Sequence, residues 1–267
     1  MAGRAAASTT VCYVPGMAGA NDHMFKTVPK ELAKRGIRFV PVDVGRIGLI
    51  QERAKRLAAV LHEWRTLDPQ FRCHFFAHSL GGLTVRYALT RDDDVRESAL
   101  SYTSFSSPHR GTPAADVLRA VLPNIHPGLE QVGVTAVARF DDAANASYSP
   151  LVPGLEYYSY RTYLGHADNA LEWTSKVGFV LLWQDLFFKG LDPLNDGLIP
   201  LSSQGFGKVI SDVKVEHAYF GDLTPVNPPV TDFFEMHANY VSGGLDAFKA
   251  KKPKLWKALK QTFKLTN

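Results

Sequence analysis

The chain has 267 residues, of which 45% are apolar and 21% charged, a composition typical of a globular protein with a substantial core. Its longest apolar stretch, 177–183, is far shorter than a bilayer-spanning helix requires, so we expect no such helix. The net charge of +4 hides an asymmetry: residues 249–267 hold seven lysines and no acid, which leaves the rest at −3, with 23 basic against 26 acidic residues.

The first ten residues are small and polar and lead straight into an apolar strand pattern. They contain no apolar stretch of the kind found in secretory leaders, so we expect an intracellular protein, with a secreted mature form as the alternative. Cys12 and Cys73 each fall in an apolar strand pattern. We expect two buried free thiols, with a bridge between neighbouring strands as the alternative.

Strand and helix patterns alternate along the chain. In order, we predict strand 10–14, helix 24–34, strand 37–44, helix 51–64, strand 71–76, helix 83–89, and strands 98–105, 155–160 and 209–215. This alternation predicts an α/β fold with a mostly parallel central sheet covered by helices on both faces. In such sheets ligands bind at the carboxyl ends of the strands.

Two segments interrupt the alternation, at about 114–137 and 166–190. The first is broken by prolines and glycines, and the second carries apolar runs. We interpret both as lid or cap excursions that wall a cleft over the carboxyl edge of the sheet. The only sharp change in composition lies near the end, so we predict one domain, 1–248, followed by a basic amphipathic tail, 249–267.

The segment 75–82, Phe-Phe-Ala-His-Ser-Leu-Gly-Gly, is the most informative part of the chain. A strand pattern ends in a serine with small residues two positions away on each side, and a helix pattern follows at once. This predicts a sharp strand-turn-helix that exposes the hydroxyl of Ser79 at the sheet edge. Ser79 is therefore the candidate nucleophile.

A serine nucleophile needs a base, and the base needs an acid to orient it. His217 follows a strand pattern and is the predicted base, whereas His237 lies in a helix pattern and is predicted to be a packed or surface residue. Asp196 in the Asn-Asp-Gly turn is the predicted acid. Asp192 is its main competitor, and Asp212 and Glu216 are weaker ones, while the alternative reading of the turn is a solvated surface loop.

The oxyanion of an acyl-transfer intermediate needs two aligned backbone donors. The N–H of Leu80, directly after the nucleophile, is one candidate. The N–H of Met17, in the glycine-rich loop after the first strand, is the other. His78 and His109 are assigned no catalytic role: we expect His78 to point into the fold and His109 to fix a loop.

Several of these motifs together resemble the bacterial triacylglycerol lipases of the Pseudomonas and Burkholderia type, which have the α/β-hydrolase fold. The matching segments are VPGMAG at 14–19, AHSLGG at 77–82, SPHRGTPAAD at 107–116, ARF at 138–140, YYSY at 157–160, NDGLIP at 195–200, VEH at 215–217 and HAN at 237–239. The resemblance implies Ser79 as nucleophile, Asp196 as acid and His217 as base. Position 15 is Pro where that family usually has His, and position 77 is Ala where it more often has Gly.

Two departures limit what the resemblance implies. Those lipases hold a structural calcium with an Asp two residues after the catalytic histidine, and that position is Tyr219 here. We therefore expect no metal and no cofactor. The lid segment is also shorter and richer in proline, so activation at a lipid interface is not carried over.

These patterns predict a serine hydrolase of carboxylic esters that acts on lipid esters through Ser79, His217 and Asp196. The alternatives are a general esterase, a thioesterase or an acyltransferase with the same residues, and a non-catalytic binding protein on the same scaffold. The expected partner is a lipid or small ester, with no nucleic acid. Residues 249–264 can form a basic amphipathic helix, which predicts contact with an anionic membrane surface or, alternatively, packing against the domain.

Overall fold

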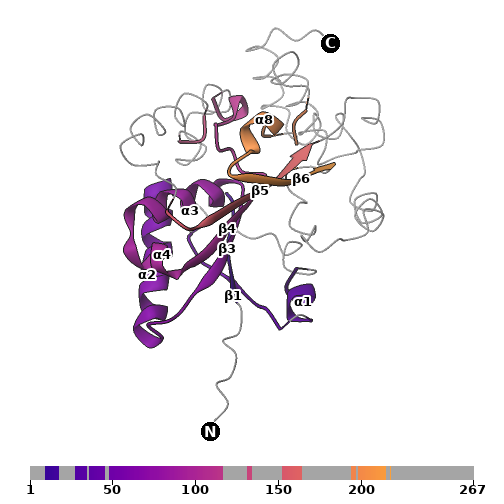
Figure 1. Ribbon diagram of the computed structural model, residues 1–267. Coiled ribbons are helices and arrows are strands. Elements are labelled where there is room, and N and C mark those ends of the chain that lie inside the picture. The colour runs from indigo at the N-terminus through magenta and orange to yellow at the C-terminus, as the bar shows by residue number, and fades with distance from the viewer. Residues whose placement is uncertain are drawn as a thin grey trace, which may run out of the picture.

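In the computed structural model the residues described are 10–17, 28–34, 36–45, 48–116, 131–133, 152–163, 194–196, 198–214 and 217. Within these ranges six strands form one parallel sheet in the order β2-β1-β3-β4-β5-β6 (Figure 1). The strands are β1 (Thr10–Val14), β2 (Arg38–Pro41), β3 (Cys73–His78), β4 (Ala99–Phe105), β5 (Glu156–Tyr163) and β6 (Lys208–Lys214). The helices are α1 (Val28–Ala33), α2 (Ile50–Leu67), α3 (Leu80–Arg91), α4 (Asp93–Ser98) and α8 (Leu201–Gln204).

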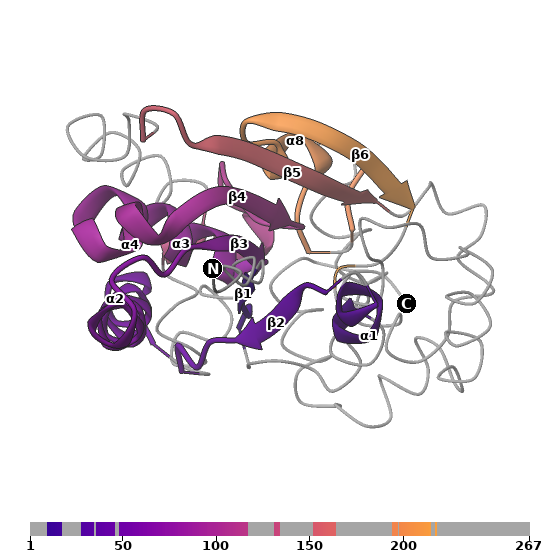
Figure 2. The ribbon, with the colours of Figure 1, turned by 60° about the horizontal axis from the view of Figure 1, so that its bottom comes forward.

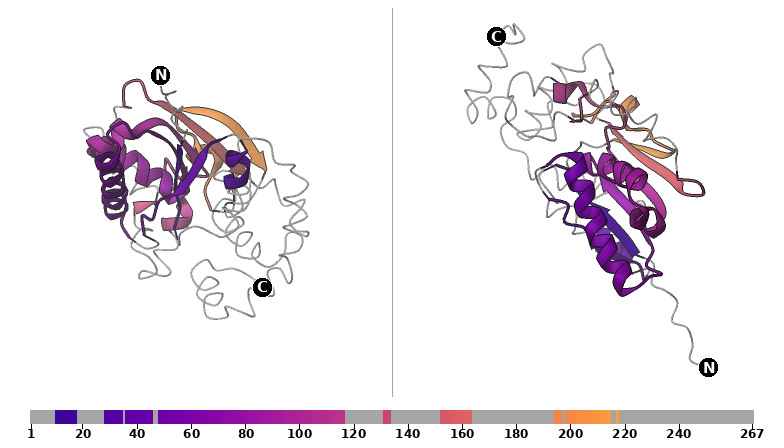
Figure 3. Two further views of the ribbon diagram at one scale, coloured as in Figure 1. Left: turned by 90° about the horizontal axis from the view of Figure 1, so that it is seen from below. Right: turned by 90° about the vertical axis from the view of Figure 1, so that its left-hand side faces the viewer.

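The helices lie on both faces of the sheet. α2, α3 and α4 gather on one face, and α1 lies on the other side, next to β2 (Figures 2 and 3). Every residue of β1 is buried, because a parallel strand in the middle of a covered sheet has no solvent-facing side. The predicted class, a mostly parallel α/β sheet with helices on both faces, is confirmed.

The strand register brings several loops to one edge of the sheet. Val14, the last residue of β1, pairs with Ala77 on β3. His78 pairs with Phe105, the last residue of β4, and Phe105 pairs with Tyr160 on β5. The segments that follow β1, β3 and β4 therefore leave the sheet side by side at its carboxyl edge.

The core between the sheet and the helices contains side chains from both. Leu57 and Leu61 of α2 and Phe75 of β3 are fully buried. Cys12 and Cys73 are also buried and free, and burial, together with contact with the thiol of Cys12, raises the pKa of Cys73. The prediction of two core thiols therefore agrees with the described structure.

Two short helices have no counterpart among the predicted elements. α4 begins after Asp92, whose carboxylate accepts a hydrogen bond from the backbone N–H of Val95 at 3.0 Å. The acidic run 92–94 thus contains the N-cap of this helix. α8 is a single turn that follows Pro200.

Other predictions lie wholly or largely outside the described residues. Of the two excursions, only 114–116 and 131–133 are described, and both His237 and the basic tail fall outside these ranges. No helix in the described part combines the length and the apolarity needed to cross a membrane.

Truncation of Leu61 tests this core. Leu61→Ala should lower the free energy of unfolding by about 2–5 kcal/mol, because it leaves a cavity between α2 and the sheet. Leu67→Ala is the matched control on the same helix, since Leu67 is 80% exposed, and should change stability by less than about 0.5 kcal/mol. If urea unfolding shows that both variants lose the same free energy of unfolding, the described packing of Leu61 is contradicted.

Candidate active site

Ser79 occupies a strained turn between β3 and α3. Its backbone φ is 54° and its ψ is −127°, a region that residues other than glycine rarely adopt. The neighbouring structure holds the turn in place: the Ser79 N–H donates to the Phe105 carbonyl at 2.9 Å, and the Ser79 carbonyl accepts from Gly82 N–H at 3.0 Å. The predicted strand-turn-helix at this serine is therefore present.

Two glycines allow the backbones around Ser79 to approach each other. A Cβ at position 81 would overlap the backbone carbonyls of Val14 and Pro15, and a Cβ at position 16 would lie 2.8 Å from the Cβ of Ser79. A side chain at either position would push the glycine-rich loop away from the serine. The loop after β1 thus lies directly against the turn at Ser79.

His217 lies between Ser79 and Asp196 and contacts both. Its Nε2 is 2.8 Å from the Ser79 Oγ, and its Nδ1 is 2.8 Å from the Asp196 Oδ2. The backbone N–H of His217 also donates to the Asp196 carbonyl at 3.0 Å. The structure therefore brings together all three side chains that the sequence singled out.

The Asp196 carboxylate is fully buried. Its Oδ1 accepts hydrogen bonds from the backbone N–H groups of Leu198 and Ile199, at 3.0 and 2.8 Å. The turn around it is therefore folded onto the carboxylate and is not a solvated surface loop. Backbone donors of this kind compensate a buried negative charge.

The competing acids do not occupy this position. Asp212 pairs with Arg161 through bonds of 2.6 and 2.7 Å on the exposed side of β5 and β6. Asp192 and Glu216 lie outside the described residues. Among the acids that the structure describes, Asp196 is therefore the one bonded to His217.

A buried arginine anchors the glycine-rich loop. Arg53 of α2 donates to the carbonyls of Pro15 and Gly16, the latter at 3.2 Å. It also bonds to the Gly45 carbonyl at 2.6 Å and to the Thr84 hydroxyl at 3.2 Å. Burial lowers the pKa of Arg53 to about 10, so its guanidinium remains charged at neutral pH.

The bond from Arg53 to the Gly16 carbonyl also fixes the direction of the Met17 N–H. The peptide between Gly16 and Met17 is trans, so the N–H of Met17 points opposite to the Gly16 carbonyl that Arg53 holds. Leu80 is the first residue of α3, and the N–H of such a residue has no partner within its own helix. The two N–H groups predicted to hold the oxyanion thus belong to the two segments that adjoin Ser79, the glycine-rich loop and the start of α3.

His78 contacts the site from the interior. Its Nε2 lies 3.0 Å from the His217 carbonyl, and the two imidazole rings are 4.9 Å apart between centroids. Desolvation, with a smaller contribution from the neighbouring His217, lowers the pKa of His78 to about 3. His78 points into the fold as expected, but it also touches the backbone of His217, which the sequence analysis did not foresee.

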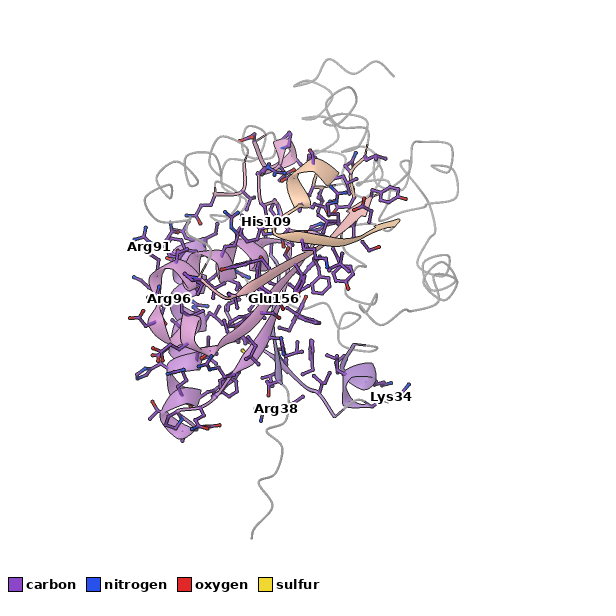
Figure 4. The ribbon with its side chains drawn as sticks, in the orientation of Figure 1. Lys34, Arg38, Arg91, Arg96, His109 and Glu156 are labelled. Atoms are coloured by element: carbon purple, nitrogen blue, oxygen red, sulfur yellow. The ribbon has the colours of Figure 1, made fainter. Side chains whose placement is uncertain are left out.

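His109 lies in the interior near the edge of the sheet, whereas Lys34 and Arg91 point outward (Figure 4). The His109 Nε2 is 2.9 Å from the Ser104 hydroxyl, and the His109 carbonyl accepts a hydrogen bond from Arg86 at 3.2 Å. These bonds hold the loop after β4, in agreement with the expectation for His109. Burial, with smaller effects from Arg86 and Arg110, lowers its pKa well below the ordinary range.

Sequence reasoning missed Arg53, and its position offered a signal. Arg53 falls on the same face of α2 as Ile50, Leu57 and Leu61, where an apolar residue is expected. Thr162 on β5 and Gln204 on α8, which surround Asp196, carried no such signal in the sequence. Within the described residues, no group of three or more His, Cys, Asp or Glu is arranged to hold a metal ion.

No protein-family model matches the chain. Among curated proteins, 196 residues are 26% identical to triacylglycerol lipase 2 of Saccharomyces cerevisiae, covering 70% of this chain and 58% of that protein. A further match, to a triacylglycerol lipase of Vibrio cholerae, is 26% identical over 100 residues, 38% of this chain and 31% of that protein. The matches thus span between about a third and somewhat over half of the relatives' length.

Two solved structures have a similar fold over most of the chain. The mature form of Bacillus licheniformis lipase BlEst2 has a TM-score of 0.67 at 16% identity and covers 86% of this chain and 93% of that one. The metagenomic carboxyl esterase MGS0156 has a TM-score of 0.64 at 17% identity, over 98% and 79%. The fold is therefore that of the α/β-hydrolases, the class that includes these lipases and esterases.

The buried neutral state of His78 predicts a loss of stability in acid. Unfolded chains take up this proton below about pH 6.5, whereas the folded protein does not until about pH 3, so stability falls as the pH drops through that window. Between pH 7 and 5 the wild type should lose about 2 kcal/mol more than His78→Gln, whose amide can still donate to the His217 carbonyl but does not titrate.

Urea unfolding at several pH values measures this difference. His62→Gln is the matched control, because the side chain of His62 is 73% exposed, and it should follow the wild-type pH dependence far more closely. If wild type and His78→Gln lose stability in parallel between pH 7 and 5, the imidazole at position 78 is not held neutral by burial.

Proposed function

We propose that the protein is a serine hydrolase of carboxylic esters, in which Ser79 is the nucleophile, His217 the base and Asp196 the orienting acid. The observation that carries this proposal is the unbroken hydrogen-bonded path from the Ser79 Oγ through His217 to the Asp196 Oδ2, with 2.8 Å at each step. The similarity to proteins named as lipases and esterases supports the same reaction class.

The chemistry follows from the direction of these bonds. Asp196 accepts the Nδ1–H of His217, which leaves the Nε2 free to take the hydroxyl proton of Ser79 as its oxygen attacks the ester carbonyl. The tetrahedral intermediate collapses when His217 gives that proton to the departing alcohol. An acyl group remains on Ser79, and water activated by His217 then releases the carboxylic acid.

The oxyanion of each intermediate forms next to the turn at Ser79. We assign its stabilisation to the N–H groups of Met17 and Leu80. The assignment is supported by the contact of Gly16 with Ser79 and by the bond from Arg53 that orients the peptide between Gly16 and Met17. Leu80 adds the amino end of α3, where the helix dipole favours negative charge.

For the substrate we propose a lipid ester, and for the narrower relationship the Pseudomonas and Burkholderia type of triacylglycerol lipase. Both curated relatives described above are named as triacylglycerol lipases. An apolar cluster consisting of Ile50, Leu80, Leu83, Ala115 and Val132, with Met17 packed against it, adjoins the start of α3. This cluster would favour an acyl chain over a charged substituent near the nucleophile.

Substitution of the three residues tests the proposed reaction. Ser79→Ala, His217→Ala and Asp196→Asn should each lower kcat/KM for p-nitrophenyl esters by about 10⁴-fold, because they remove the nucleophile, the base or the correct tautomer of the base. His62→Ala and Asp68→Asn, at exposed positions, are matched controls and should retain wild-type activity. Hydrolysis by folded Ser79→Ala at the wild-type rate would overturn the proposal.

The same assays separate the alternatives. Rates on p-nitrophenyl esters of graded chain length, an acyl thioester and an emulsified triglyceride distinguish a lipase from a general esterase and a thioesterase, and transfer to an added alcohol detects an acyltransferase. We expect activity to rise with acyl length and to extend to the emulsion. Activity confined to short soluble esters would remove the lipid substrate but leave the catalytic residues in place.

We also propose that the tail binds an anionic membrane surface. Leu255, Trp256, Leu259 and Phe263 fall on one face of a helix pattern with lysines around it, and each lysine near anionic lipid contributes about 1 kcal/mol. Deletion of 249–267 should weaken binding to vesicles containing phosphatidylglycerol at least about tenfold. Binding to pure phosphatidylcholine should change little.

A charge-preserving comparison controls for this deletion. Replacing the seven tail lysines by arginine should retain binding to the anionic vesicles, whereas replacing them by glutamine should lose it. Vesicle co-sedimentation at low and high salt measures both. Unchanged binding after the deletion would show that the tail packs elsewhere or has no part in lipid contact.

A further inference from the structure

The Asp196 carboxylate has side-chain partners besides His217. The hydroxyl of Thr162, at the end of β5, donates to the Asp196 Oδ2 at 2.8 Å. This is the same oxygen that accepts from His217. Thr162 is fully buried, so water does not compete for this bond.

A second hydroxyl lies directly behind the first. The Oγ of Ser106 is 2.7 Å from the Oγ1 of Thr162, and Ser106 is also fully buried. Ser106 has a backbone φ of 48°, and its N–H donates to the Tyr160 carbonyl at 3.2 Å. Strained backbone at a residue other than glycine persists only where the surroundings hold it.

The direction of these bonds follows from the supply of protons. An ionised carboxylate can only accept, and the Thr162 hydroxyl has one proton to give. Two other acceptors lie within reach among the described residues. The Gln204 Oε1, at 3.1 Å, is uncharged and already accepts from the Thr162 N–H at 2.7 Å. The Ser106 Oγ, at 2.7 Å, is also uncharged and has a proton of its own that it can donate to the Thr162 Oγ1, whereas the carboxylate has none. Thr162 therefore donates to Asp196, and Ser106 donates to Thr162.

We propose that Thr162 is a positioning residue for the catalytic acid, with Ser106 supporting it, so that the hydrogen-bonded path runs Ser106–Thr162–Asp196–His217–Ser79. This inference rests on the proposed function. Thr162 holds the Oδ2 of Asp196 in the orientation that His217 needs. It also takes a share of the negative charge on that oxygen, and Ser106 strengthens Thr162 as a donor.

Because Thr162 and His217 donate to the same oxygen, loss of the Thr162 hydroxyl should change the pH dependence of activity. Without the Thr162 hydroxyl, more of the carboxylate charge acts on the imidazole of His217, so the acid limb of the activity profile should move to higher pH. Among the described residues, His78 is the other titratable side chain that contacts His217, and it remains neutral above about pH 3. On β5, Arg161 is engaged with Asp212, and α8 presents the uncharged Gln204, whose Nε2 is 3.3 Å from the Oδ2.

The test is the pH profile of kcat/KM for Thr162→Val, which keeps the shape of the side chain and removes its hydroxyl. We expect kcat to fall roughly tenfold at the optimum, the size of effect expected for a hydrogen bond to a charged group. The acid limb of the profile should move up by about half a pH unit. Thr162→Ser should restore both, and Thr66→Val, at an exposed position of α2, should change neither.

The role of Ser106 is tested by a double-mutant cycle. Ser106→Ala should shift the acid limb in the same direction by a smaller amount, and it should add nothing in the Thr162→Val background. Should Thr162→Val fail to fold, Ser106→Ala and Thr162→Ser decide the question alone. A folded Thr162→Val or Ser106→Ala protein with the wild-type acid limb and kcat would overturn the proposal.

A readout independent of turnover separates this inference from the proposed function. The low-field proton NMR resonance of the His217 Nδ1–H should move further downfield in Thr162→Val, because its acceptor oxygen then has one donor fewer. A shifted resonance without any hydrolysis dependent on Ser79 would reject the proposed function and retain the contact of Thr162 with the acid. Hydrolysis dependent on Ser79 with an unmoved resonance would reject the role of Thr162.

Discussion

The tight turn at Ser79 is the constraint on which the rest of the site depends. A residue with a side chain is held at φ 54° between a buried strand and a helix, a conformation that the isolated chain would avoid. The approach of the two backbones leaves no room for a Cβ at position 81, and the neighbouring loop leaves little at position 16. The serine, the amino end of α3 and the glycine-rich loop are therefore fixed relative to one another by steric exclusion.

Hydrogen bonds between buried polar groups connect the other elements to this turn. The register of β1, β3, β4 and β5 brings their carboxyl ends to one edge, and the polar side chains there find partners in one another. Arg53 ties α2 to the glycine-rich loop, and Asp196 ties its turn to His217 and Thr162. Because unpaired polar groups in such a setting are costly, each of these bonds helps to hold one arrangement of the site.

The sequence predicted the parts that local patterns encode. Alternating apolar runs located the described strands to within a few residues, and the small residues around Ser79 predicted its turn. The pairing of Asp196 with His217 was expected from the turn and the strand pattern in which they lie, and the geometry agrees, while their catalytic roles remain predictions. α4 and α8 were missed because they span only 6 and 4 residues. The roles of Thr162, Gln204 and Ser106 depend on contacts between distant segments, which no local pattern reports.

The decisive experiment identifies the residue that becomes acylated, because the proposed mechanism requires a covalent intermediate on Ser79 itself. A fluorophosphonate probe mimics the acylation step, and intact-protein mass spectrometry counts the adducts. We predict one adduct per chain, placed on Ser79 by peptide mapping, absent from Ser79→Ala and formed far more slowly by His217→Ala. An adduct on another residue, or none on the folded wild-type protein, would rule out Ser79 as the nucleophile.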